Sequence, residues 1–338
     1  EDEATEDLTA FPGLTPEDFH TALNSDNERS GTINYEDGNN YIELNHWLGG
    51  LPDLKHTEKV IQIQTRHLKM LMDLGVDGFR FDAAKHMPYW VIERYINYIN
   101  AYSAQRGGDL SSTCWNYLEV ITDGDTKHYY YNWIAAITDF NMYHSMRSAF
   151  TYGGSLKTLK LPNSNQDARS ITFGRNHDTI GEINQHAIAP YSDKIDSFLA
   201  TAYVLAKSYG TPLVMSWDNN DCPFIKAGVQ FRKEMTERMR IGKTVVENVL
   251  DVINNDNILF MERGNEGFCV INKSTETFDI AVLDLTLTNL EGTYREVRNS
   301  FDVKIQRSHD KKFVSQWGNA NRGGLKIFGR EALFFTKN

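Results

Sequence analysis

The chain has 338 residues, 41% of them hydrophobic, and its 35 Lys and Arg against 45 Asp and Glu give a formal net charge of −10. The length suggests about two domains, and the acidic balance argues against a nucleic acid or an anionic membrane as partner. No apolar stretch approaches the roughly 20 residues that a membrane span needs, and the 3 cysteines show neither a disulfide framework nor a CxxC spacing.

The first part of the chain, residues 1–56, is polar and rich in Asn, Asp and Gly, and it has no sustained period. This pattern predicts loops with short strands. The acidic start, Glu1–Asp7, has no initial Met and no signal-peptide pattern. We therefore expect either a removed N-terminal segment or a piece of a longer chain.

Helices and short apolar strands alternate between residue 57 and about residue 250. The helical period predicts helices over residues 57–74, 90–106, 143–151, 193–207 and 229–249. Short apolar runs predict strands over residues 76–81, 115–120, 133–140, 170–173 and 211–216. This alternation favours an α/β fold with βα units around a parallel sheet.

After about residue 251 the period changes to two, which is typical of strands with one buried face. Gly and Asn turns separate the predicted strands, which cover residues 258–261, 267–271, 278–283, 303–306 and 332–335. We expect a small antiparallel β domain at the C-terminal end.

Carboxylates end three of the predicted parallel strands: Asp82, Glu119 and Asp178. In a parallel α/β barrel the C-terminal ends of the strands converge on one face, so acids from different strands can form one site. Clustered carboxylates suit glycoside hydrolysis, and they also suit a divalent metal ion. A single acid at a strand end is more often a helix cap or a solvated residue.

Four segments resemble motifs of the α-amylase family, and they occur in the family's order: Leu51–Leu54, Gly78–His86, Leu118–Val120 and Phe173–Asp178. The resemblance covers most of the chain from residue 51 onward. It implies a (β/α)8 TIM barrel followed by a C-terminal antiparallel β domain. Of the barrel, we find only strands four to eight in this chain.

The resemblance also implies a role for each matching residue. Asp82 would be the nucleophile, Glu119 the general acid and base, and Asp178 the residue that stabilises the distorted sugar. Arg80 lies two residues before Asp82 on the same face of its strand and can keep that carboxylate ionised by direct pairing. His177 would hydrogen-bond the sugar in the cleaved subsite.

Further residues bear on the substrate. The family uses a pair matching Lys85 and His86 on the leaving-group side, which favours an α-1,4-glucan; the alternative is a solvated Lys and a capping His. Trp217, at the end of the last barrel strand, could stack on a sugar ring, as could Tyr89, Trp90 and other aromatic residues, although most aromatic residues near a barrel belong to the core.

The function implied is that of a retaining α-glucan hydrolase, endo-acting on α-1,4 bonds of starch-like polysaccharides through a covalent glycosyl-enzyme. A transglycosidase or an α-glucosidase would use the same site, and a non-catalytic amylase-like binding protein is the alternative of another class. Secretion is expected from the resemblance, because polymeric starch is met outside the cell.

The first three barrel strands of the family have no counterpart here. We assign residues 1–56 to the end of an inserted loop domain, residues 57–250 to the second part of the catalytic barrel, and residues 251–338 to a C-terminal β-sandwich domain. An open barrel would leave long unpaired edges, so we expect a missing N-terminal segment or an N-terminal companion chain.

Calcium is a further expectation from the resemblance. The family's structural calcium would use the Asp53 carboxylate and the main-chain oxygen of His86 in this sequence. These oxygen ligands suit calcium, but the third-strand Asn of the family is absent and the ligand set is incomplete.

Overall fold

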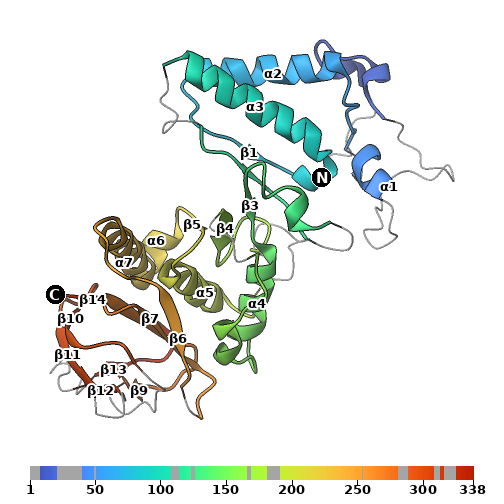
Figure 1. Ribbon diagram of the computed structural model, residues 1–338. Coiled ribbons are helices and arrows are strands. Elements are labelled where there is room, and N and C mark those ends of the chain that lie inside the picture. The colour runs from blue at the N-terminus through green and yellow to red at the C-terminus, as the bar shows by residue number, and fades with distance from the viewer. Residues whose placement is uncertain are drawn as a thin grey trace. The chain divides into compact units, whose positions relative to one another are not determined.

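The computed structural model describes residues 8–20, 40–48, 51–107, 114–122, 126–165, 169–180, 191–252, 254–280, 288–307, 313–315 and 325–338. The chain forms two compact units, Glu1–Thr138 and Asp139–Asn338 (Figure 1). The acidic start, residues 1–7, and the end of the predicted strand at 281–283 lie outside the described residues.

The first unit combines helices with short parallel strands. Its helices are η1 (Leu8–Ala10), η2 (Pro16–Asp18), α1 (Asn40–Asn45), α2 (Glu58–Asp73), η3 (Ala84–His86), α3 (Tyr89–Gln105) and η5 (His128–Tyr130). Its strands are β1 (Arg80–Phe81), β2 (Tyr117–Leu118) and β3 (Ala136–Thr138). They pair in parallel in the order β1-β2-β3.

Helices α2 and α3 run alongside each other in this unit (Figure 1). The first and last residues of both helices lie within one residue of the predicted bounds. The Thr57 hydroxyl accepts a hydrogen bond from the Val60 amide, so α2 begins where its cap lies. Gly75 follows the helix with a φ of 98°, a left-handed conformation that glycine adopts without steric cost. The apolar faces of both helices contribute to one core with the strands, including Met72, Ile92, Ile96, Leu118 and Ile137.

The register of β1 and β2 brings two predicted site residues to the same edge. Arg80 lies opposite Tyr117 and Phe81 opposite Leu118. The Glu119 amide then donates to the Phe81 carbonyl at 2.8 Å. Since the strands are parallel, Asp82 and Glu119 both emerge at their carboxyl ends.

The second unit begins with helices and two parallel strands. Its helices are α4 (Phe140–Phe150), η6 (Leu156–Lys160), α5 (Lys194–Ala206), α6 (Asp218–Asp221) and α7 (Pro223–Arg240). Strand β4 (Ser170–Phe173) pairs in parallel with β5 (Thr211–Leu213). The Asp139 carboxylate caps α4 by accepting from the Met142 amide, so this helix begins three residues before the predicted start.

The rest of the second unit is antiparallel, as predicted. Its strands are β6 (Glu247–Leu250), β7 (Ile258–Arg263), β8 (Gly267–Asn272), β9 (Phe278–Asp279), β10 (Gly292–Glu296), β11 (Asp302–Arg307), β12 (Phe313–Ser315), β13 (Lys326–Ile327) and β14 (Glu331–Lys337). Seven of them form one sheet in the order β12-β11-β10-β14-β8-β7-β6, and β9 pairs with β13. Stacked aromatic rings fill its core, with the centroids of Phe268 and Phe335 4.3 Å apart.

The predicted helix over residues 229–249 is wrong in its second half. Helix α7 ends at Arg240, and Gly242 follows with a φ of 83°, which stops the helix. Residues Glu247–Leu250 then form β6, which pairs antiparallel with β7. Pairing with the sheet therefore decides the structure of this segment. A helical pattern in the sequence contains no information about a partner strand that lies elsewhere in the chain. Strands β10, β12 and β13 were not predicted either.

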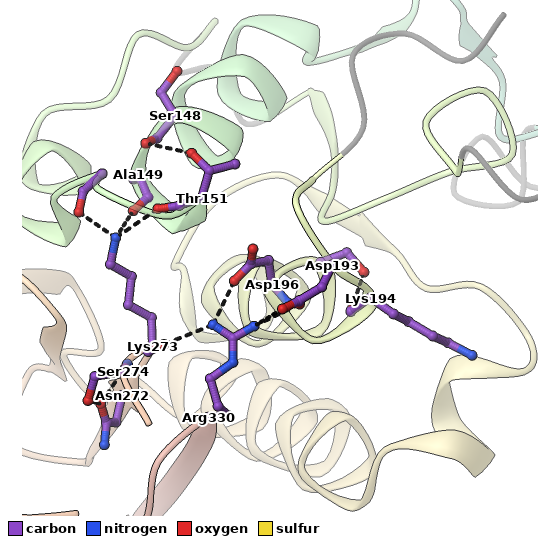
Figure 2. A network of polar contacts seen from close by, with 12 residues as sticks. Ser148, Ala149, Thr151, Asp193, Lys194, Asp196, Asn272, Lys273, Ser274 and Arg330 are labelled. Carbon is purple, nitrogen blue, oxygen red and sulfur yellow. Dashed lines mark hydrogen bonds and ion pairs between the residues drawn. The ribbon is translucent and has the colours of Figure 1, made fainter. Parts of the chain in front are cut away.

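A polar network joins this sheet to α4 and α5 (Figure 2). The buried Lys273 ammonium donates to the carbonyls of Ala149 at 2.8 Å and Thr151 at 3.1 Å, and also to that of Gly154. The guanidinium of Arg330 pairs with Asp193, which caps α5, and with Asp196, each at 2.7 Å. The Lys273 ammonium thus gives a donor to the Ala149 carbonyl in the last turn of α4, a position where the helix itself supplies no amide.

None of the helices in the described segments is long and apolar enough to cross a membrane.

Candidate active site

One guanidinium holds two of the predicted carboxylates. Arg80 Nη2 lies 2.9 Å from Glu119 Oε1, and Arg80 Nη1 contacts Asp82 Oδ1. The predicted pairing of Arg80 with Asp82 is therefore present. The contact with Glu119 was not predicted, and it follows from the parallel register of β1 and β2.

The two carboxylates differ in exposure. The Asp82 side chain is 72% exposed, whereas that of Glu119 is 11% exposed. The second oxygen of Glu119 accepts from the Ala83 amide at 2.9 Å. Ala83 has a φ of 46°, an uncommon conformation for a residue with a Cβ, and the Ala84 amide then donates to the Glu119 carbonyl. The turn after β1 thus fixes the Glu119 carboxylate and leaves Asp82 open to solvent.

The two carboxylates stabilise the charged form of the Arg80 guanidinium. Burial acts to lower the pKa of its guanidinium, but the carboxylates of Glu119 and Asp82 outweigh burial and raise the pKa above its ordinary value. Arg80 is therefore a permanent cation between the two acids.

Lys85 and His86 follow on η3, in the turn that begins with Asp82. Lys85 is buried, which speaks against a solvated lysine, and His86 Nδ1 lies 3.1 Å from the Glu43 carbonyl oxygen. The Tyr131 hydroxyl donates to the carbonyls of Lys85 at 3.2 Å and Met87 at 3.3 Å. These bonds anchor the turn from two sides.

The second unit carries His177 and Asp178 in the turn after β4, and Trp217 after β5. His177 is exposed, and its Nε2 lies 3.4 Å from Asp178 Oδ2. The Asp178 amide donates to Asn176 Oδ1 at 3.1 Å, and the Asn176 amide donates to Thr179 Oγ1 at 2.8 Å. The side chains of Asn176 and Thr179 thus shape the turn that presents Asp178.

A buried ion pair supports this turn, and the sequence analysis did not predict it. Arg175 Nε donates to Asp218 Oδ2 at 3.0 Å, Arg175 Nη2 contacts Asp218 Oδ1, and the Phe198 ring lies 4.9 Å from the guanidinium carbon. Asp218 directly follows Trp217, which is partly exposed. The pair therefore connects the turn after β4 with the turn after β5, and the only sequence signal for it is a charged residue in each turn.

The two expected calcium ligands are oxygen atoms, as calcium prefers, but they are fewer than a calcium site needs. The Asp53 carboxyl contacts His20 Nδ1 at 2.5 Å, and burial raises the pKa of this carboxyl to about 7, which favours its protonated form. Calcium takes about six to eight oxygen ligands. The described segments contain no group of three or more His, Cys, Asp or Glu side chains that could hold a metal ion.

The chain is similar in sequence to α-amylases. No family model matches the chain. An α-amylase of Thermomonospora curvata is 31% identical over 59% of this chain and 32% of its own length. An α-amylase of Aeromonas hydrophila is 30% identical over 66% of this chain and 49% of its own length. An α-amylase-related protein of Drosophila jambulina is 30% identical over 65% of this chain and 45% of its own length. The chain thus spans half or less of these relatives.

Comparison with solved structures gives the same fold. α-Amylase I of Eisenia fetida matches with a TM-score of 0.70 and 18% identity over 96% of this chain and 73% of that one. A cyclomaltodextrin glucanotransferase matches with a TM-score of 0.60 and 18% identity over 89% of this chain and 64% of that one. The prediction of an α/β part followed by an antiparallel β domain is confirmed, and the count of barrel strands remains a prediction.

Proposed function

This chain is α-amylase-like in both sequence and fold, and from that premise we propose that it carries the catalytic carboxylates of a retaining α-glucan hydrolase. The observation that carries the proposal is the contact of a single guanidinium, that of Arg80, with both Asp82 and Glu119. Retaining glycosidases place their two carboxyl groups about 5–5.5 Å apart, closer than inverting ones. An arginine that contacts both carboxylates favours the shorter distance between them, which is that of retaining enzymes.

In the proposed reaction the exposed Asp82 carboxylate attacks the anomeric carbon. The bond between that carbon and the leaving oxygen breaks, and Glu119 gives its proton to the leaving oxygen. Water then attacks the glycosyl ester, Glu119 takes a proton from the water, and Asp82 leaves as a carboxylate. Arg80 lowers the energy of the ionised acids throughout.

The proposed substrate is an α-1,4-glucan of the starch type, cleaved within the chain. Lys85, His86, His177 and Trp217 would contact its sugar units, and Asp178 would stabilise the distorted ring. Starch is a neutral polymer met outside the cell, so we also propose secretion. Calcium would bind the Asp53 carboxylate and the His86 main-chain oxygen, together with further oxygen ligands.

Transfer of the glycosyl group to another sugar is the second candidate, because one solved structure with this fold is that of a cyclomaltodextrin glucanotransferase. The same carboxylates would serve, with a sugar hydroxyl in place of water. The products formed from maltoheptaose separate the two reactions: free reducing ends indicate hydrolysis, and longer or cyclic sugars indicate transfer.

Asp82→Asn tests the proposal in the polypeptide expressed from its full coding sequence. We expect starch hydrolysis to fall by at least about a thousandfold, because an amide cannot act as the nucleophile. Asp77→Asn is the matched control, since Asp77 is an exposed carboxylate that precedes the same strand, and it should keep full activity.

The alanine variant of Glu119 tests the mechanism as well. Azide attacks the glycosyl ester without needing a general base. On a maltosyl fluoride, whose leaving group needs no acid, Glu119→Ala should therefore regain activity with azide and give a glycosyl azide of retained configuration. Full activity of Asp82→Asn, or an inverted product, would refute the assignment.

A further inference from the structure

The first unit contains a cavity of about 800 Å³ that the proposed catalytic residues do not line. Its walls come from segments far apart in the sequence, among them Trp90 at the start of α3 and Tyr130 in η5. His20 and His56 complete it from the N-terminal side. A cavity of this size falls in the range of ligand sites.

Aromatic side chains around this cavity are unusually exposed. Tyr89 is 51% exposed, and Trp90 and Tyr130 are each 41% exposed. The ring centroids of Tyr89 and Trp133 lie 6.2 Å apart and those of Tyr129 and Tyr130 lie 4.8 Å apart, each pair edge to face. Gathered exposed aromatic rings mark a binding surface, whereas core aromatic residues are buried.

The polar groups of the wall suit a neutral ligand with hydroxyl groups. The residues that line the cavity include no Asp or Glu. The Lys55 ammonium donates to the Glu17 carbonyl at 3.0 Å, so it is already engaged. Thr57, Asn45 and the two histidines supply hydrogen-bonding side chains beside the rings. His56 Nε2 is buried and has no hydrogen-bond partner among the described atoms.

We propose that this cavity is a second sugar-binding site, which holds a short stretch of α-glucan on Trp90 and Tyr130. The apolar faces of glucose rings would stack on these two side chains, and the histidine, Thr57 and Asn45 side chains would meet the sugar hydroxyls. The inference goes beyond the proposed function, because it concerns binding without bond cleavage.

The second site would matter for polymers and not for short sugars. Tyr131 lines the cavity, and its hydroxyl holds the turn that follows Asp82, so the two sites share a structural support. A polymer held in the cavity presents further segments to the same molecule at a raised local concentration. A short sugar that fills only one site gains nothing from this.

Affinity electrophoresis of the full-length protein in amylose gels tests the proposal. Trp90→Ala and Tyr130→Ala should each weaken binding to amylose about tenfold, the loss expected for one stacked aromatic side chain. Trp90→Phe should keep most of the binding. Trp115→Ala is the matched control, because Trp115 lies in the same unit, is 49% exposed and does not line the cavity.

Asp82→Asn separates this inference from the proposed function, because it should bind amylose as the wild type does whether or not it hydrolyses starch. Cleavage of a short maltoside by Tyr130→Ala should stay within twofold of the wild type, while Trp90→Ala is compared for amylose binding alone. Circular dichroism confirms that both variants are folded, and Tyr130 lies on a different element from Trp90. Unchanged amylose binding by both folded variants, or an equal loss in Trp115→Ala, would overturn the proposal.

Discussion

Removing one partner of the ion pair of Arg175 and Asp218 should strongly destabilise the second unit. Only 5% of the Arg175 side chain and 1% of the Asp218 side chain are exposed. Two hydrogen bonds join them, and a phenyl ring covers the guanidinium. Removing one partner therefore leaves an uncompensated charge away from water, which typically costs about 3–5 kcal/mol.

Asp218→Asn removes the charge and keeps the shape of the side chain, and Arg175→Met removes the guanidinium and keeps an apolar stem. We expect each variant to lose about 3–5 kcal/mol of unfolding free energy, which for a unit of this size lowers the Tm by on the order of 10 °C. The double variant should lose less than the two single losses together, because neither charge is then left alone.

An exposed pair in the same unit provides the control. Arg240 Nη1 lies 3.3 Å from Glu237 Oε2, and both side chains are largely exposed. Glu237→Gln should change the free energy of unfolding by less than about 0.5 kcal/mol, because water screens such pairs. Urea unfolding measures all variants. A loss in Asp218→Asn as small as that in Glu237→Gln would refute the reasoning from burial.

Three further predictions concern other charged groups. Lys273→Met should lose about 2–3 kcal/mol of unfolding free energy, because the carbonyl of Ala149 at the end of α4 and two carbonyls in the turn after it lose a buried charged donor; an unchanged urea midpoint would contradict this. Burial would raise the pKa of Glu247, but the buried Lys207 ammonium outweighs it and holds the pKa below its usual range. This carboxylate therefore stabilises the fold above its unfolded pKa and stops doing so as the pH falls through its folded pKa. The stability difference between wild type and Glu247→Gln should thus shrink between about pH 5 and pH 3, and a constant difference would count against the pair. Added calcium should raise the Tm of the wild type in a thermal shift assay and leave that of Asp53→Asn unchanged; equal shifts would exclude Asp53 as a ligand.

The local features of the fold could be predicted from the sequence. Helices α2, α3 and α5 lie within a few residues of their predicted bounds, because each combines a periodic apolar pattern with a recognisable end. Thr57 and Asp193 accept hydrogen bonds from the first turns of α2 and α5. Capping acts within four residues, so a sequence contains all the information that it needs.

Contacts between distant residues could not be predicted in the same way. The β6 strand forms because β7 is available to pair with it, and nothing in the sequence of residues 247–250 specifies that partner. Arg175 and Asp218 are likewise single charged residues in two turns until β4 and β5 align. Opposite charges are common in turns, and only the strand register selects which of them meet.

The two proposed catalytic acids lie between these two cases. Asp82 and Arg80 are close in sequence, so their contact could be predicted from strand alternation alone. Glu119 joins them only through the pairing of β1 with β2. In the structure both of its oxygens accept hydrogen bonds or pair with a cation, an environment that suits an ionised carboxylate. The geometry therefore corresponds to the state in which Glu119 has given up its proton. In the proposed reaction Glu119 must hold a proton before the bond breaks, and a neutral carboxyl attracts the Arg80 guanidinium less than a carboxylate does. The positive charge of Arg80 would then act mainly on Asp82, at the moment when that carboxylate attacks.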